Sequence, residues 1–90
     1  MTNEAIIKFI EAKGHATKAL NIHFKTRSTI TGLFVRGNDF QELQSKNFWR
    51  IVPRSQFDAY NHSKNVGLAK IFHGGEFSRL TLHTAGFDNN

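Results

Sequence analysis

The chain has 90 residues, of which 39% are hydrophobic, nine are Phe and none is Cys. This length predicts one domain over residues 1–90, and the apolar content argues against a disordered chain. The lack of Cys excludes disulfides and thiolate metal sites. Near the N-terminus the longest apolar run is residues 5–7. We therefore expect no signal peptide, no membrane partner and a cytoplasmic location.

The charge balance is basic, with 12 Lys and Arg against 7 Asp and Glu. No acidic residue occurs between Glu11 and Asp39, or between Glu42 and Asp58, and both stretches carry several cations. A polyanion such as RNA or single-stranded DNA is the natural partner for such a surface. The alternative interpretation is an ordinary solvated surface that keeps the protein in solution.

An amphipathic pattern predicts a helix over residues 3–13. Asn3 is expected to cap its N-terminus, and Gly14 to follow its C-terminus. Alternating apolar residues then predict a strand over residues 18–25. Residues 29–36 are rich in β-branched side chains and predict a second strand, close enough to the first to form a hairpin.

Gly32 interrupts the second strand and predicts a bulge or a sharp bend. A turn or short helix is expected over residues 39–45, where Asn38 and Gln41 have the spacing of a capping box. Residues 47–52 predict a third strand, which Pro53 should end because proline donates no backbone hydrogen bond.

The last third of the chain alternates between turn and strand patterns. Residues 55–61 are expected to form a helical turn, and residues 68–73 a fourth strand. The glycines at 74–75 predict a two-residue hairpin turn that leads into a fifth strand over residues 76–83. Residues 84–90 have the composition of a polar tail.

This order predicts an α+β fold, in which an N-terminal helix precedes a β-rich part over residues 18–83 with about five short antiparallel strands. A sheet of this size has exposed edges, so we expect it to curl into a small SH3-like barrel. An open antiparallel sheet that carries the helix on one face is the alternative.

Sequence fragments support the barrel by resemblance. Three of them resemble pieces of the two Sm motifs: Leu20-x-Ile22-x-Phe24, Ile30-x-Gly32-x-Phe34 and Val35-Arg36-Gly37-Asn38. Similarity to Sm-like proteins implies a small barrel, RNA binding and ring formation, although the Arg-Gly fragment lies late in that family and early here. Residues 47–52 and 71–74 also resemble a group of short bacterial proteins without an assigned activity.

Patterns typical of catalysis or metal binding are weak. The five His residues are spread along the chain without the spacing of metal ligands. His73 and Glu76 flank the glycine pair and are the most suggestive local combination for an enzyme, which would need a deep polar pocket around them. We therefore predict a non-enzymatic protein with no metal and no cofactor.

The leading hypothesis is a binding module for nucleic acid or another polyanion. Trp49 would stack on a base if exposed, whereas burial in the core is the alternative. The cations expected to contact phosphates are Lys25, Arg27, Arg36, Arg50 and Arg54. The second hypothesis is a protein-interaction or structural module, including a homo-oligomer, that associates through a sheet edge or an apolar patch.

Overall fold

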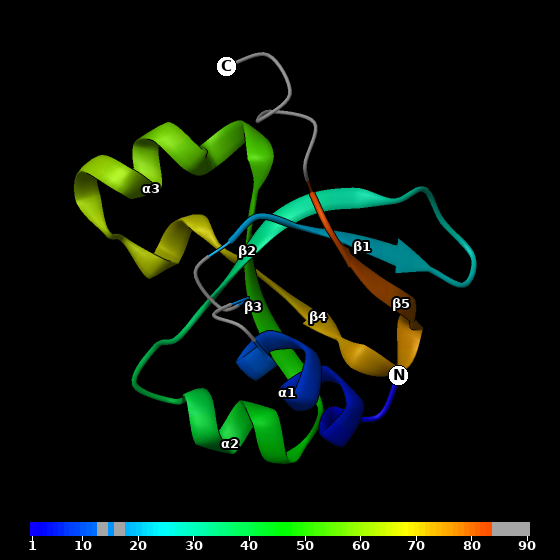
Figure 1. Ribbon diagram of the computed structural model, residues 1–90. Helices are drawn as coiled ribbons and strands as arrows, with labels where there is room; N and C mark the ends of the chain where they lie inside the picture. The colour runs from blue at the N-terminus through cyan, green and yellow to red at the C-terminus, as the bar shows by residue number, and fades with distance from the viewer. Residues whose placement is uncertain (13–14, 16–17, 84–90) are drawn as a thin grey trace.

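The computed structural model describes residues 1–12, 15 and 18–83, and shows an α+β fold with an N-terminal helix and five antiparallel strands in an open sheet (Figure 1). The elements in chain order are α1 (Asn3–Glu11), β1 (Leu20–Phe24), β2 (Ile30–Val35), α2 (Phe40–Ser45), β3 (Phe48–Pro53), η2 (Arg54–Gln56), α3 (Phe57–Ser63), η3 (Val66–Leu68), β4 (Lys70–His73), η4 (Gly74–Glu76) and β5 (Phe77–Leu82). No helix in the part of the chain that the structure describes has the length and apolar content needed to cross a membrane.

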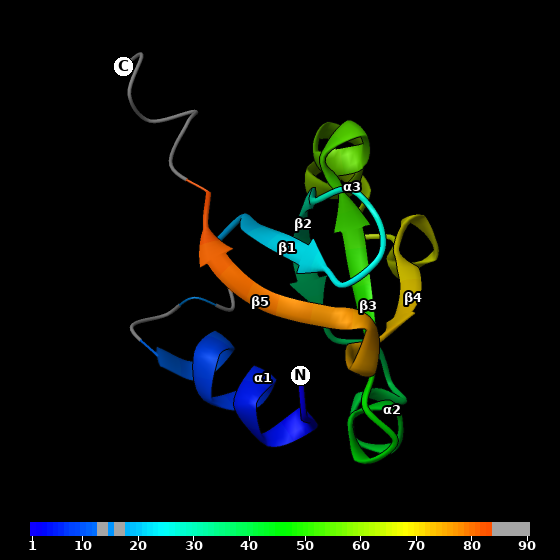
Figure 2. The same ribbon diagram turned by 90° about the vertical axis from the view of Figure 1, so that its right-hand side faces the viewer.

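The strand order in the sheet is β4-β3-β2-β1-β5, so the two last strands of the chain are its two edges. The predicted hairpin at residues 74–75 is therefore wrong, because β4 pairs with β3 and β5 pairs with β1. The connection is η4, in which Gly74 is buried so tightly that an added Cβ would lie 2.2 Å from Asn47 Oδ1. Figure 2 shows β5 and β1 on one side of the twisted sheet, with β3 and β4 on the other.

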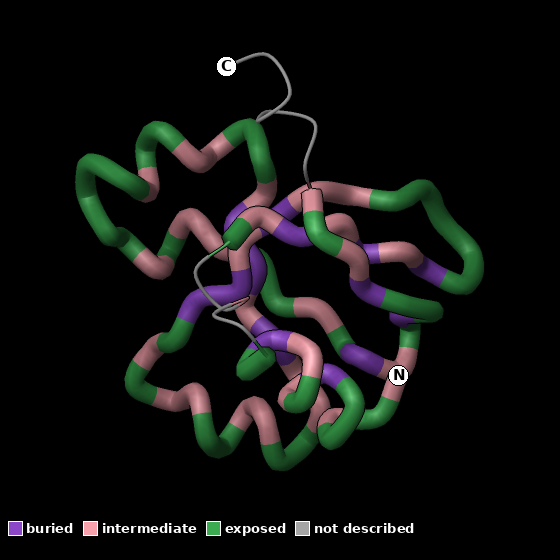
Figure 3. Tube along the Cα trace, in the orientation of Figure 1, coloured by how far each residue is buried: buried purple, intermediate pink, exposed green. Residues whose placement is uncertain are grey.

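The core lies between α1 and the inward face of the sheet, where the apolar positions of the alternating strands meet Ile6 and Ile10. Trp49 packs edge to face on Phe34, with ring centroids 5.9 Å apart. Figure 3 shows the buried stretches on α1 and the strands, while α3 is exposed or half-buried. The buried core residues are Ile6, Ile10, Leu20, Ile22, Phe24, Phe34, Trp49, Ile51, Phe77 and Leu80.

Helix α1 begins at Asn3, and its N-cap lies one residue earlier than predicted. Thr2 is the N-cap, and its hydroxyl accepts a hydrogen bond from Ala5 N–H at 3.2 Å. Asn3 is not the cap, because its side-chain amide donates to the carbonyl of Gln44 at 3.1 Å and ties α1 to α2. The helix ends at Glu11, and the predicted role of Gly14 lies outside the described residues.

Gly32 forms no bulge. It lies in regular register between Leu20 and Pro53. The reason for glycine is close packing, since an added Cβ would lie 2.4 Å from Ile51 Cγ2. The irregularity in the sheet is instead in β1, where the register with β5 shifts after His23.

Two predicted boundaries around β3 also change. Pro53 is the last residue of β3 and pairs with Gly32, so the strand ends at the proline as predicted, but one residue later than its predicted bound. Helix α2 is present as predicted, but Asp39 rather than Asn38 is its N-cap residue, and no side chain caps it. The Asp39 carboxylate accepts hydrogen bonds from Arg50 instead of capping the helix.

Asn47 joins four segments at the end of the sheet. Its φ of 64° is left-handed, a conformation that Asn tolerates better than most residues. Its amide nitrogen donates to Met1 O at 3.0 Å, and its amide oxygen accepts from the Trp49 indole at 2.8 Å. Its backbone bonds to Gln44 and Gly74, so this residue fixes the end of β3 against η4.

Candidate functional site

A groove of about 530 Å³ runs between the edge strand β4 and the loop that joins β1 to β2; we call it the β4 groove. Half-buried aromatic rings and exposed cations occur together along it. The described residues that line it are Arg27, Ile30, Phe48, Pro53, Lys70, Ile71, Phe72, His73 and Glu76.

Arg27 is fixed above aromatic rings at one end of the β4 groove. Its guanidinium carbon lies 4.9 Å from the centroid of Phe24 and 5.8 Å from that of Phe72. These rings are themselves in contact, with centroids 5.8 Å apart. Cation–π attraction orients the guanidinium plane, and its other face is left for a ligand because Arg27 is exposed.

A second aromatic group is formed by Phe48 and His73, which are paired across β3 and β4. Their ring centroids lie 4.9 Å apart at an interplanar angle of 79°. His73 Nδ1 accepts a hydrogen bond from Gly75 N–H at 3.0 Å. In the neutral imidazole the proton is therefore on Nε2, which makes that nitrogen a donor at the groove.

The backbone of β4 also faces outward at this groove. Gly74 N–H bonds to Asn47 O at 2.7 Å, and alternate residues of an antiparallel pair are bonded to the partner strand. The register then directs the backbone groups of Ile71 and His73 away from β3. The Ile71 side chain is 49% exposed beside them.

The structure brings three of the predicted cations to this region. Arg27 lines the β4 groove directly. Lys25 is exposed in the same loop, and its backbone N–H bonds to Glu76 O at 3.0 Å. Arg54 is exposed immediately after Pro53, which lines the groove.

The other predicted site residues lie elsewhere. Trp49 is 1% exposed, so it is a core residue and not a stacking surface. Arg50 is paired with Asp39, with Nη2 at 2.7 Å from Oδ2 and Nε at 3.3 Å from Oδ1. This hydrogen bond holds the pKa of the Asp39 carboxyl below its usual range and raises the pKa of Arg50. Arg36 lies over the Phe40 ring, 4.7 Å from its centroid, and lines a different groove.

The sequence patterns did not indicate Lys70 and Phe72 as site residues, and they indicated His73 only together with Glu76 as a candidate catalytic pair. Their strand was predicted, but the expected hairpin at residues 74–75 would have paired it with the fifth strand. An exposed Lys and Ile next to each other in a four-residue strand is a signal of an edge, where lysine blocks unwanted pairing.

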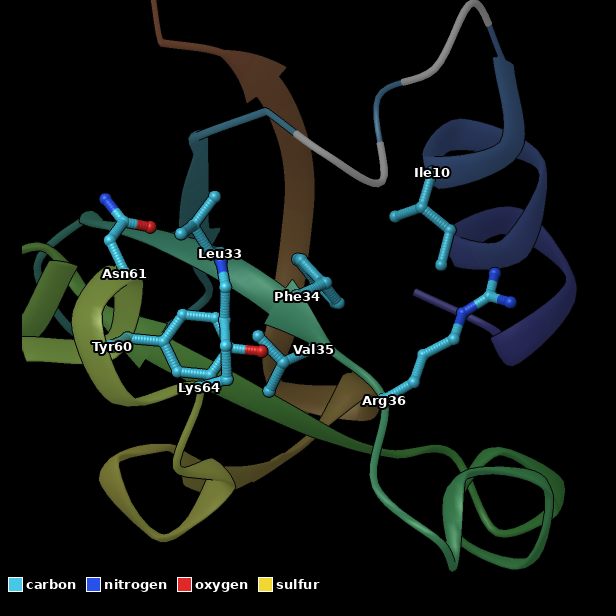
Figure 4. Close-up of a pocket in the computed structure, with 8 residues that line it drawn as sticks. All are labelled: Ile10, Leu33, Phe34, Val35, Arg36, Tyr60, Asn61 and Lys64. Carbon is cyan, nitrogen blue, oxygen red and sulfur yellow. The ribbon is translucent and has the colours of Figure 1, made fainter.

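The second groove lies beside α3 and also has a volume of about 530 Å³; we call it the α3 groove (Figure 4). Its floor comes from β2 and one wall from the end of α3. The described residues that line it are Ile10, Leu33, Phe34, Val35, Arg36, Tyr60, Asn61 and Lys64.

Function has to be inferred from these two grooves. Comparison with protein families, with curated proteins and with solved structures gives no significant match. Within residues 1–12, 15 and 18–83, no three His, Asp or Glu side chains come together as a metal site.

Proposed function

We propose that the protein is a binding module for single-stranded nucleic acid, and that the strand lies in the β4 groove. The observation that carries the proposal is Arg27 held over the rings of Phe24 and Phe72, in a groove that Lys70 also lines. Unpaired bases stack on aromatic rings and on guanidinium planes, while lysine and arginine neutralise the phosphates between them.

The form of the groove favours a single strand over a duplex. Half-buried Phe48 and Phe72 offer ring surface only to bases that have left a stack. Glu76 is the one carboxylate among the described residues of the groove, against Arg27 and Lys70. The formal net charge of +5 adds a long-range attraction to any polyanion.

The proposal is tested by fluorescence anisotropy with labelled oligo(U) and oligo(dT) of about a dozen nucleotides. We expect binding that weakens steeply between about 50 and 200 mM salt, and weaker binding of a duplex of the same length. Replacing both Arg27 and Lys70 by Gln should flatten the slope of log K against log salt by about 1.4, or about 0.7 per lost phosphate contact.

Two further variants separate stacking from charge. Phe48→Leu should weaken binding of the oligonucleotide by about 1–3 kcal/mol, because one base loses its stacking partner. The salt dependence of binding should stay unchanged. Lys8→Gln is the control, since Lys8 is an exposed cation on α1 that lines neither groove. No binding at low salt, or equal losses for Lys8→Gln and the groove variants, would contradict the proposal.

The second candidate function is strand addition at β4. The outward backbone groups of Ile71 and His73, with the exposed Ile71 side chain, favour a peptide or a second copy of the chain at this edge. Ile71→Pro removes one outward N–H and is tolerated at a sheet edge. Light scattering in high salt decides this case, because oligomers present in the unmodified protein and lost in Ile71→Pro would support it.

We further propose that the open sheet is a partly closed SH3-like barrel, as the resemblance to Sm-like proteins implies. The two edge strands are joined by only the three residues of η4. The end of β1 contacts this connection through the Lys25–Glu76 hydrogen bond, and Phe24 contacts Phe72 of β4. A solution structure that lacked contacts between the β4 and β5 edges would contradict the barrel.

A further inference from the structure

The α3 groove has the size and floor of a small-molecule site. Leu33 and Val35, whose side chains share one face of β2, form an apolar floor, and the end of α3 forms a wall. Its volume of about 530 Å³ falls in the usual range for ligand pockets. Figure 4 shows Tyr60, Asn61 and Lys64 on one side of Val35, with Arg36 on the other.

The charge of this groove is one-sided. Arg36 and Lys64 line it, and none of the described residues that line it is acidic. In the described part of the chain neither cation forms an ion pair, in contrast to Arg50, which is paired with Asp39. An apolar floor with free positive charge at its rim is complementary to an amphipathic anion.

Lys64 is held in a conformation that lysine does not favour. It is the C-cap of α3 with a φ of 55°, a left-handed position where glycine or asparagine is preferred. Asn47, the other left-handed non-glycine residue in the described part of the chain, is of the preferred type and uses its side chain in hydrogen bonds. The Lys64 amine instead lies 5.4 Å from the Tyr60 ring centroid, at the groove. Backbone strain that is kept in this way is typical of ligand sites.

We propose that the α3 groove binds a small amphipathic carboxylate, with its apolar body on Leu33 and Val35 and its carboxylate held by Lys64. Tyr60 and Asn61 line the same end and supply polar groups, and Arg36 adds positive potential at the other end. This inference is independent of nucleic-acid binding, because it uses different residues and needs no polymer.

Decanoate is the probe, and decanol and decyltrimethylammonium are its neutral and cationic controls. In a titration of the full chain followed by NMR, decanoate should shift the amides of Leu33, Val35 and Tyr60. We expect decanol to bind at least about tenfold more weakly, because the charge contact is lost. Shortening the acid by one methylene should lower its affinity about fourfold, as long as the removed methylene was in contact with the apolar floor.

Substitutions at Lys64 separate binding from structure. Lys64→Gln should lower the affinity for decanoate about tenfold and leave the affinity for decanol unchanged, since only the charge is removed. Lys64→Gly should raise the melting temperature by relieving the left-handed strain, yet weaken decanoate as much as Lys64→Gln. A merely structural lysine would not move these two readouts in opposite directions.

Three results would overturn the inference. The first is equal affinity for decanoate and decanol, which would make the groove a non-selective apolar surface. The second is an unchanged decanoate affinity in Lys64→Gly. The third is a shift of the Leu33, Val35 and Tyr60 amides by an oligonucleotide but not by decanoate, which would assign the α3 groove to the polymer.

Discussion

The two grooves have the same volume and each carries two cations, but the apolar surface between the cations differs. In the β4 groove Arg27 lies on aromatic rings at a sheet edge, next to a strand whose backbone faces outward. In the α3 groove Lys64 and Arg36 each lie over a single ring at the rim, and the floor between them is aliphatic. The two grooves therefore suit different ligands although they carry equal numbers of cations. Aromatic rings favour the flat bases of a nucleic acid, whereas an aliphatic floor favours a flexible hydrocarbon chain.

The largest expected effect is on the stability of the fold that holds both grooves, and it comes from Asn47, the residue that fixes the end of β3. Asn47→Ala removes the acceptor of the buried Trp49 indole and puts alanine at a φ of 64°. We expect a loss of about 3 kcal/mol in the free energy of unfolding, measured with urea. Asn47→Gly should be about 1 kcal/mol less harmful, because glycine accepts the left-handed backbone. Equal losses for the two variants would show that the backbone conformation contributes nothing.

A smaller loss is expected at the centre of the sheet. Gly32→Ala places a Cβ 2.4 Å from Ile51 Cγ2 and 3.0 Å from Val52 O, and the second of these atoms is backbone. Overpacking should cost about 2 kcal/mol in urea unfolding. Gly67→Ala is the matched control, since its nearest contact is the exposed side chain of Asn65. A stable Gly32→Ala variant would contradict the close packing of β2 on β3.

Lys64→Gly is expected to act in the opposite direction. Removing the left-handed lysine should stabilise the protein by about 1 kcal/mol. Lys64→Gln keeps a side chain at the same backbone position and serves as the control without stabilisation. If Lys64→Gly were destabilising, the amine over Tyr60 would be a structural contact and the distinction between the grooves would weaken.

The smallest effect concerns acid stability. The hydrogen bond from Arg50 lowers the pKa of Asp39 in the folded protein from its ordinary value of 3.8. The ion pair therefore stabilises the fold above about pH 4, and this contribution is lost as the pH falls through the lowered pKa. Unfolding of the unmodified protein and of Asp39→Asn should differ at neutral pH and converge as the pH falls through the lowered pKa of Asp39. A constant difference across this range would contradict the role of the charge.

Local patterns in the sequence predict much of the fold. The period-two alternation of β1 and the amphipathic stripe of α1 depend on neighbouring residues, so both elements are confirmed, with shorter bounds. The prediction of a hairpin at residues 74–75 was wrong because the conformation of this segment depends on Asn47, which is far away in the chain and packs on Gly74.

The candidate site was harder to predict for the same reason. Arg50 looked like a free cation, but it meets Asp39 only after the chain has turned through α2. Arg27 and Lys70 are 43 positions apart in sequence, and only the sheet brings them to one groove. Charge counts indicated a polyanion partner, whereas the position of each charge depended on long-range pairing.

The most direct test compares two double variants that remove the same charge. Arg27→Gln with Lys70→Gln should lose most affinity for single-stranded oligo(U), and Arg36→Gln with Lys64→Gln should keep it, with both measured by anisotropy at one salt concentration. This difference is expected because only the first pair lies in the β4 groove beside half-buried rings. Equal losses in the two variants would mean that net charge alone binds the strand, and would contradict the β4 groove as its site.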